Sequence, residues 1–571
     1  MRIPVAAANG FVRSSGLSVP EAEFNAIDSM TAELYQPLNL TAAEISAGVT
    51  PTNYAYPTGF SQRYGVTGNG TTDDTAAINN WAKVCTTAGI AGKLQGGTFL
   101  ISSPVVFNVG ADGFSLEGPS STACLFSISS SFSGGTIAVQ IKGNGSTCQW
   151  RIGGFMIEPS SGGSGSAVLG LQIGDPTTAS VGLAGYQAST LYDIEVQGFQ
   201  TLWQFTHCRL IRVVDCAGWN QGYSVSSDST CLNITQNGSF TGDLTFDNCQ
   251  WVIPSTVLNG ACARINSPVG PYNDTNGNCQ IAGIRFRSCI FYHGQYGLQI
   301  YAAASSYVSD IWVDSGSQFE GDYGQGVTGA GTISNIRLES NGSGTRMEDV
   351  HIDHCYVNGG FAPSSVSAGG VVLTCTGSGS IMRSIFVTHN YLWANNVELV
   401  ATYGVSNTME AIVIQGNIIQ DCANQSGGTG AAIIINGVTG YVVADNTCTV
   451  GGANQKPNYV VNLVAGSNGV CHDNTAAAGC VATGIVLNGL GNQVVTASVP
   501  AAPATYTFTN TTGGPVNLSL NVNGATITAL SIGGYSLSAP PAAYSLYTVP
   551  TGVTAVFAYT GATPIIEYSP L

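Results

Sequence analysis

Charged side chains are scarce in this sequence. Aspartate, glutamate, lysine and arginine make up 8% of the 571 residues, and 16 basic residues stand against 32 acidic ones. The formal net charge of −16 at pH 7 would repel nucleic acid and anionic membranes. We therefore expect no nucleic-acid partner and no membrane insertion, and favour a partner that carries little or no charge.

Long apolar runs are missing as well. No stretch is long enough to cross a bilayer, and the first residues, "MRIPVAAANGFVRSSG", contain neither the apolar segment nor the cleavage site of a signal peptide. We therefore expect a protein that stays in the cytosol where it is made or leaves by a route without a signal peptide, such as lysis.

Metal-binding cysteine pairs are also absent. None of the 16 cysteines forms a CxxC pair with metal-ligand spacing, so the sequence predicts no metal site and no cofactor. Several cysteines recur at one repeated position, described next. We interpret them as buried free thiols that fill apolar space, not as the disulfide framework of a small secreted protein.

Short strands and an internal repeat are what the sequence does contain. The segments "LTFDNCQW", "IRFRSCIF", "VHIDHCYV", "IFVTHNYL", "IVIQGNII" and "YVVADNTC" each place two inward apolar residues before a Cys or Asn. The last such positions, Asn390, Asn417, Asn446 and Asn474, are 27, 29 and 28 residues apart. This period and the absence of helical patterns predict a parallel β-helix whose inward asparagines stack and hydrogen-bond along the axis.

Three zones follow from composition. Residues 1–56 form a short head or attachment segment, 57–498 the β-helix, and 499–571 a small C-terminal β domain. The last zone alternates short strands and turns, as in "VNLSLNVNGATITALSIGG", and Glu567 is its only charged residue. Because charge is depleted at interface cores, we expect this domain to contact other chains.

The segment "RYGVTGNGTTDDTAAINNWAKVC…GGTFLISSPV", residues 63–105, resembles the start of the pectate-lyase-like right-handed β-helix superfamily, and more narrowly bacteriophage tailspike proteins. The resemblance implies an all-β chain with a right-handed parallel β-helix, a capping helix near 73–86, a short N-terminal head and a C-terminal β-sandwich-like domain. In such a chain residues 499–571 would make trimer or glycan contacts. It also implies a virion homotrimer that acts outside the cell and attaches to a phage baseplate or tail adaptor through its N-terminal segment. Such proteins bind, and usually cleave, bacterial surface polysaccharide: capsule, exopolysaccharide or O-antigen.

Side-chain parity predicts where a glycan would bind. Successive strand residues face opposite sides, so in "SGSQFEGDYGQG" an inward Ser317 turns Phe319 inward and Glu320 and Asp322 outward. The same outward register holds aromatic and amide residues in the other coils. The predicted substrate-binding residues are Trp219, Tyr292, Trp312, Asn358, Tyr391 and Trp393. Trp312 comes from the preceding sheet.

The predicted catalytic residues are Glu320, Asp322 and Asp314. Residues two apart on a strand are about 6.6–6.8 Å apart, close to the separation of an inverting glycoside hydrolase. Glu320 would act as the acid and Asp322 as the base, with Asp314 around a corner on the preceding strand. A non-catalytic adhesin or tail fibre and a polysaccharide lyase remain alternatives, although the acidic balance disfavours an anionic uronate substrate.

Overall fold

The computed structural model describes residues 40–570 with internal gaps, together with two paired N-terminal strands, β1 (Arg13–Ser14) and β2 (Leu17–Ser18). The ranges that it does not describe between residues 40 and 570 are 111–113, 144–146, 176–182, 221–228, 237–239, 254–259, 268–280, 304, 322–332, 359–367, 396–399, 405–407, 423–429, 450–456, 465–467, 478–479, 482–483, 488–494, 497–498, 511–514, 538–543 and 551. Most of the predicted head (residues 1–12, 15–16 and 19–39) and the predicted base Asp322 therefore lie outside the described residues.

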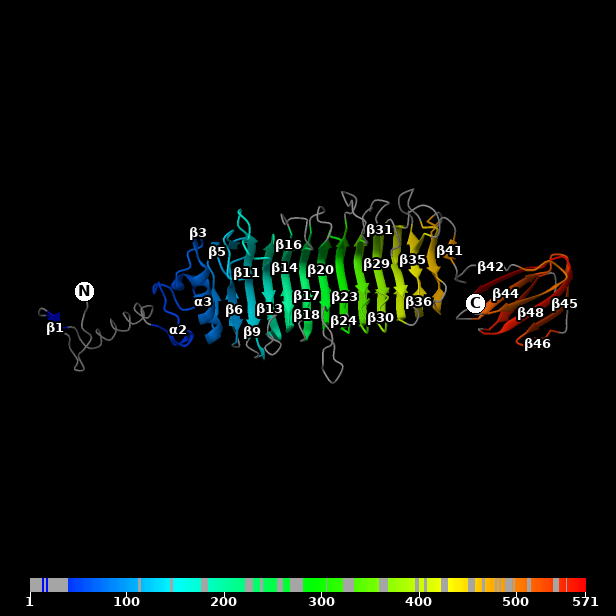
Figure 1. Ribbon diagram of the computed structural model, residues 1–571, viewed down its shortest axis with the longest axis horizontal. Coiled ribbons are helices and arrows are strands. Elements are labelled where there is room, and N and C mark those ends of the chain that lie inside the picture. The colour runs from blue at the N-terminus through cyan, green and yellow to red at the C-terminus, as the bar shows by residue number, and fades with distance from the viewer. Residues whose placement is uncertain are drawn as a thin grey trace.

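The central part of the chain is a right-handed parallel β-helix (Figure 1). One coil runs through β24 (Tyr307–Asp314), β25 (Gln318–Glu320) and β26 (Ile333–Glu339). Each of these strands pairs in parallel with the corresponding strand of the coils before and after it. The coils thus build a long-strand face, a short-strand face and a third face, as the repeat predicted.

The strands of the three faces have regular positions in the coils. The long-strand face contains β15 (Cys208–Val214), β18 (Thr241–Asp247), β21 (Ile281–Arg287), β24, β27 (Arg346–Asp353), β30 (Ile381–Thr388), β33 (Met409–Gln415), β36 (Val438–Ala444) and β39 (Asn468–His472). The short-strand face contains β16 (Ala217–Trp219), β19 (Gln250–Val252), β22 (Ile290–Tyr292), β25, β28 (Tyr356–Asn358), β31 (Tyr391–Asn395), β34 (Ile418–Cys422), β37 (Thr447–Thr449) and β40 (Thr475–Ala476). The third face contains β6 (Val105–Val109), β9 (Ile137–Gly143), β12 (Leu169–Ile173), β14 (Thr201–Thr206), β17 (Ser229–Thr235), β20 (Gly260–Ser267), β23 (Tyr296–Ala302), β26, β29 (Ala368–Cys375), β32 (Val400–Gly404), β35 (Ala431–Ile435), β38 (Tyr459–Leu463) and β41 (Gly484–Leu487).

The N-terminal end of the β-helix is covered by two helices. These are α2 (Ala42–Ala47) and α3 (Thr75–Ala88), with the 3₁₀ turn η2 (Ser61–Tyr64) between them. The first coils add β3 (Asn69–Asp73), β4 (Ala91–Lys93), β5 (Gly97–Ile101), β7 (Phe114–Glu117), β8 (Cys124–Ile128), β10 (Thr147–Cys148), β11 (Trp150–Pro159) and β13 (Leu183–Gln197). Ile78 and Trp81 of α3 join the apolar core of the coils and close its end.

Two aspartates with different partners precede the first turn of α3. Asp74 is the N-cap residue, but its carboxylate makes no bond to the helix. It accepts hydrogen bonds from the backbone N–H groups of Thr67 (2.7 Å) and Gly68 (3.0 Å) instead. Asp73 accepts from the Thr75 N–H at 3.0 Å, so this residue satisfies one of the free donors of the first turn.

The repeated Cys and Asn side chains point into the core as predicted. Asn390, Asn417, Asn446 and Asn474 are all buried and form an asparagine ladder. Within it, each amide nitrogen donates to the amide oxygen of the next coil at 2.8–3.0 Å. The described cysteines are free thiols, and all but Cys471 are buried. The interpretation of these thiols as core-filling groups is confirmed for the residues that the structure describes.

The C-terminal part contains two four-stranded antiparallel sheets with a core of their own (Figure 1). Their strands are β42 (Val495–Thr496), β43 (Ala504–Thr509), β44 (Val516–Asn521), β45 (Ala525–Ile532), β46 (Tyr535–Ser536), β47 (Tyr544–Val549), β48 (Thr554–Gly561) and β49 (Ile565–Pro570). In β44 the buried Val516, Leu518 and Leu520 alternate with half-buried polar residues, and Phe557 of β48 joins the same core, which gives the two-sheet packing expected of a β-sandwich. Among the described residues, no helix is long and apolar enough to cross a membrane.

Candidate functional site

The short-strand face has the predicted outward register. In β25, Gln318 is exposed, Phe319 is fully buried and Glu320 is half-buried, so parity places the Glu320 carboxylate on the outside. Strand pairing aligns Glu320 with Tyr292 in the coil before and with Asn358 in the coil after. From β16 to β34 the outward register in chain order is Trp219, Val252, Tyr292, Glu320, Asn358, Trp393 and Gln420.

A hollow of about 580 Å³ lies on this face, where the long strands turn into the short strands. It spans the three successive coils that contain β25, β28 and β31. The residues that line it are Gly316, Gln318, Glu320, His354, Cys355, Tyr356, His389 and Tyr391. Glu320 is the only carboxylate among these lining residues.

Two tyrosines form a wall of the hollow. Tyr356 and Tyr391 are paired across neighbouring strands, and their rings stack 5.6 Å apart at an angle of 6°. The Tyr391 hydroxyl donates a hydrogen bond to the side-chain oxygen of Gln420. Burial, together with the nearby Glu320 carboxylate and Tyr391, raises the pKa of Tyr356, so this phenol stays protonated and can donate a hydrogen bond at neutral pH.

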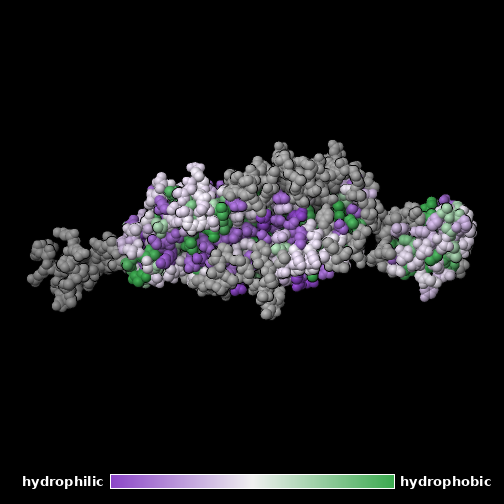
Figure 2. Space-filling model, viewed as in Figure 1, coloured by the Kyte–Doolittle hydropathy of each residue, from purple (hydrophilic) through white to green (hydrophobic). Residues whose placement is uncertain are grey.

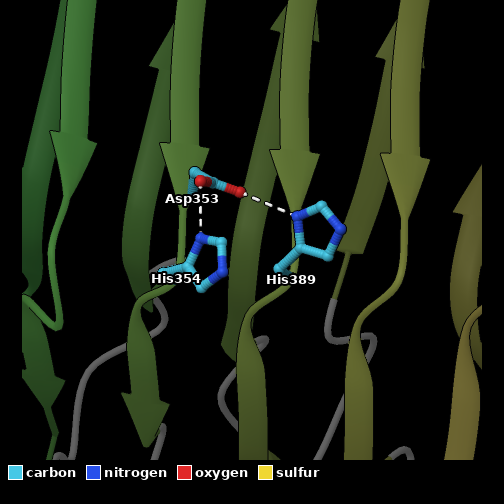
Figure 3. Close-up of side chains that lie close together, drawn as sticks. All are labelled: Asp353, His354 and His389. Carbon is cyan, nitrogen blue, oxygen red and sulfur yellow. Dashed lines mark hydrogen bonds and ion pairs between the residues drawn. The ribbon is translucent and has the colours of Figure 1, made fainter.

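Two histidines and an aspartate form the adjoining edge of the hollow (Figure 3). His354 Nδ1 lies 2.6 Å from one carboxylate oxygen of Asp353, and His389 Nδ1 lies 3.1 Å from the other. Thr388 Oγ1 donates to the same carboxylate at 2.5 Å. Burial disfavours ionisation of Asp353, but the hydrogen bonds from Thr388, His354 and His389 outweigh it and lower the pKa of this carboxyl group.

The other predicted site residues lie on either side of the hollow. Tyr292 and Asn358 flank Glu320, and Trp393 follows Asn358 in the next coil. Trp219 occupies the same register two coils before Tyr292. The structure thus brings Glu320 and Tyr391 together in one hollow and places these four residues along the same outer face.

Trp312 and Asp314 belong to the long-strand face, around the corner that parity predicted. Both are on β24, and neither lines the hollow. Trp312 is stacked 3.7 Å from the ring of His351 and donates a hydrogen bond to Asp310 at 2.7 Å. Asp314 faces Arg287 at 4.0 Å. The expected roles of these two residues stay predictions.

A second polar surface follows the third face, which the sequence analysis did not consider. Hydrophilic residues gather along the middle of the β-helix in Figure 2. Amides at the same register of this face bond to one another, for example Gln204 to the buried Gln172 at 2.9 Å and Asn233 to Gln204 at 3.1 Å. Farther along, Gln299 donates to Glu339 at 2.8 Å. These groups satisfy one another between coils, so their pairing stabilises the stack.

The histidine pair was also missed by sequence reasoning, although a signal was present. Strand parity describes the residues that follow each inward Cys or Asn and does not apply to the corner residue just before it. In "DHC" and "THN" that residue is His354 and His389. Both have positive φ angles, 52° and 53°, which mark the corner of the coil and direct their side chains toward solvent.

Comparison with known proteins finds similarity in fold at low sequence identity. No family model matches the chain, and no curated protein matches it. Among solved structures, the Dettilon tailspike protein is 13% identical with a TM-score of 0.47, covering 89% of this chain and 93% of that one. The tailspike protein of E. coli bacteriophage HK620 in complex with a pentasaccharide is 12% identical with a TM-score of 0.44, covering 98% of this chain and 97% of that one.

An enzyme is also among the similar structures. The mannuronan C-5 epimerase A-module of Azotobacter vinelandii is 12% identical with a TM-score of 0.43, covering 75% of this chain and 96% of that one. At such identities the likeness concerns the fold alone. The roles of individual residues are therefore argued from the contacts within this chain.

Proposed function

We propose that this chain is a phage tailspike-like protein that binds a neutral bacterial surface polysaccharide along its short-strand face and hydrolyses it at the hollow around Glu320. The observation that carries the proposal is a single outward carboxylate beside two stacked tyrosines in one open hollow. Tyrosine rings offer an apolar surface with a polar edge, which suits a sugar ring and its hydroxyl groups.

In the proposed reaction, Glu320 protonates the glycosidic oxygen that leaves, and Asp322 acts as the base that activates water. Two carboxyl groups roughly 6.5–9.5 Å apart leave room for that water and give inversion at the reacting carbon. Tyr356 and Tyr391 hold the sugar next to Glu320, and Tyr292, Asn358 and Trp393 contact the neighbouring sugar units. Asp314 remains a candidate partner carboxylate from the adjacent long strand.

The same proposal includes the assembly expected from the family resemblance. The chain forms a homotrimer, its N-terminal segment attaches to a phage baseplate or tail adaptor, and residues 499–571 make trimer or glycan contacts. Analytical ultracentrifugation of the full chain and of a chain ending at residue 498 tests the assembly, because loss of the trimer in the shorter chain assigns trimerisation to the C-terminal part.

The catalytic proposal is tested by digesting a panel of bacterial surface glycans and measuring new reducing ends. Glu320→Gln keeps the shape of the side chain but has no acidic proton to transfer, so cleavage should fall by about 10²–10⁴-fold while glycan binding persists. Asp322→Asn should behave in the same way. The matched control is Glu410→Gln, which changes an exposed glutamate on the long-strand face and should cleave at the wild-type rate.

Three outcomes would contradict hydrolysis at this site. Undiminished cleavage by Glu320→Gln would remove this residue from the chemistry. Glycan binding by the wild-type chain without new reducing ends would assign it to the non-catalytic adhesins. Products that absorb as unsaturated sugars would assign it to the lyases.

A further inference from the structure

The turn from the long strand to the short strand places two histidines side by side. At this corner the backbone has a positive φ angle, and in two successive coils the corner residue is His354 or His389. Because the coils stack in register through β27 and β30, the two rings lie 5.0 Å apart and within 24° of parallel. The pair therefore results from coil stacking, since the two residues are 35 positions apart in the sequence.

Both rings direct the same nitrogen at one carboxylate. Asp353 ends β27, and its two oxygens lie 2.6 Å from His354 Nδ1 and 3.1 Å from His389 Nδ1 (Figure 3). One ligand atom from each of these three side chains lies within 4.8 Å of the other two. Among the residues that the structure describes, no other group of three His, Cys, Asp or Glu side chains brings its ligand atoms so close.

We propose that Asp353, His354 and His389 bind a divalent transition-metal ion such as Zn²⁺ through two imidazole nitrogens and one carboxylate oxygen. Zinc binds histidine nitrogen at about 2.0–2.1 Å and carboxylate oxygen at about 2.0–2.2 Å, so two of its ligands are at most about 4.3 Å apart. Small rotations of the side chains therefore bring all three atoms to one ion. On binding, each imidazole carries its proton on Nε2 and presents Nδ1 to the metal.

The surroundings suit an exchangeable ion with open coordination positions. The side chains of His354 and His389 are 65% and 55% exposed, so an ion reaches them from solvent. Three protein ligands leave a fourth position for water or for an oxygen of a bound molecule. Thr388 Oγ1 holds the carboxylate in place at 2.5 Å, as supporting hydrogen bonds do in metal sites.

The proposed ion would lie close to the proposed glycan site. His354 and His389 line the hollow together with Glu320, so the bound metal lies on the edge of the proposed glycan site. The open coordination position is then available to a sugar hydroxyl group. Metal binding itself does not depend on the proposed hydrolysis and is measured without a glycan.

The chain contains its own control for a histidine next to an aspartate. His472 Nδ1 lies 2.8 Å from Asp473, and both side chains are exposed, but among the described residues no second histidine joins this pair in a three-ligand group. A pair of this kind supplies two ligands, which is one fewer than the corner at Asp353. Comparing metal binding after substitution at each site therefore distinguishes a three-ligand metal site from an ordinary His–Asp hydrogen bond.

The test is isothermal titration of the full wild-type chain with ZnCl₂ and, separately, NiCl₂. We expect one saturable site per chain, with affinity reduced at least about tenfold in His354→Gln and in His389→Gln. His472→Gln and Glu320→Gln should bind metal like the wild type, and the latter separates this proposal from the catalytic one. Circular dichroism verifies that each variant is folded.

Two results would overturn the proposal. The first is the absence of a saturable site in the wild-type chain. The second is wild-type affinity in the double variant His354→Gln/His389→Gln. Should a histidine variant fail to fold, the electron paramagnetic resonance spectrum of Cu²⁺ bound to the wild-type chain decides, because a spectrum without nitrogen hyperfine coupling contradicts imidazole coordination.

Discussion

The asparagine ladder offers the sharpest test of how the coils are held together. Asn417 is fully buried, and its side chain makes four hydrogen bonds. Its oxygen accepts from the backbone and side-chain nitrogens of Asn390, both at 3.0 Å. Its nitrogen donates to Val387 O at 2.9 Å and to Asn446 at 2.8 Å. Asn417→Ala removes all four hydrogen bonds.

The expected loss can be estimated group by group. The backbone N–H of Asn390 loses the acceptor described for it, which costs about 1–3 kcal/mol for a buried donor. Three further polar groups each lose one hydrogen bond, at about 0.5–1.5 kcal/mol apiece. We therefore expect Asn417→Ala to lower the free energy of unfolding by about 2–6 kcal/mol, since these neighbouring losses do not add fully.

Two matched variants sharpen this prediction. Thr447→Ala changes an outward residue of the following coil and should lower the free energy of unfolding by less than about 0.5 kcal/mol. Asn417→Cys should cost less than Asn417→Ala, because Cys355 occupies the equivalent position in an earlier coil and donates weakly to the carbonyl of Val313 at 3.4 Å.

The assay is guanidinium unfolding followed by tryptophan fluorescence, with hydrogen–deuterium exchange of peptides from β30 to β39 to locate the effect. Faster exchange should be confined to the coils that contact Asn417. If Asn417→Ala and Thr447→Ala have the same unfolding midpoint, the buried hydrogen bonds do not stabilise the stack and the reasoning is refuted.

The remaining predictions concern the N-terminal cap and the buried thiols. Glu44 and Arg63 form a buried ion pair at 2.5 Å, and although desolvation opposes it, hydrogen bonding from Arg63 lowers the pKa of Glu44. A carboxyl group whose pKa is lower in the folded chain than in the unfolded chain stabilises the fold at pH values above its unfolded-state pKa, about 4.3 for Glu. This stabilisation is lost as the pH falls through the folded-state pKa. Glu44→Gln should therefore destabilise the cap by about 3–5 kcal/mol at pH 7, because Arg63 stays buried without its partner. The melting temperature of this variant should also fall less steeply than that of the wild type as the pH is lowered below about 4.3. An equally steep fall in both proteins would contradict this. Burial raises the pKa of both Cys85 and Cys262 to about 12. Neither thiol should therefore be alkylated at pH 8 until the chain unfolds. Peptide mapping that finds either cysteine labelled in the native chain would refute this prediction.

The architecture was predictable because its signals are local and repeated. An inward Cys or Asn every coil fixes which residues of each short strand face the core, since strand side chains alternate by backbone geometry alone. That is why the register of Glu320 with Tyr292 and Asn358 could be read before any coordinates. The capping helix was predicted near 73–86 and spans Thr75–Ala88. Which aspartate bonds to its first turn depends on tertiary contacts, because the N–H groups of Thr67 and Gly68 bind the Asp74 carboxylate.

The sequence by itself determined the β-helix, the inward asparagines and the outward direction of Glu320, because each depends on spacing along one strand or on a repeat. Only the tertiary structure decided what surrounds that carboxylate. The stacking of coils brings Tyr356 and Tyr391 face to face and closes a hollow around Glu320. The left-handed corner at His354 and His389, residues that no strand parity describes, joins both rings to Asp353. Contacts between coils depend on how the chain is wound, so a pattern read along the sequence does not contain them.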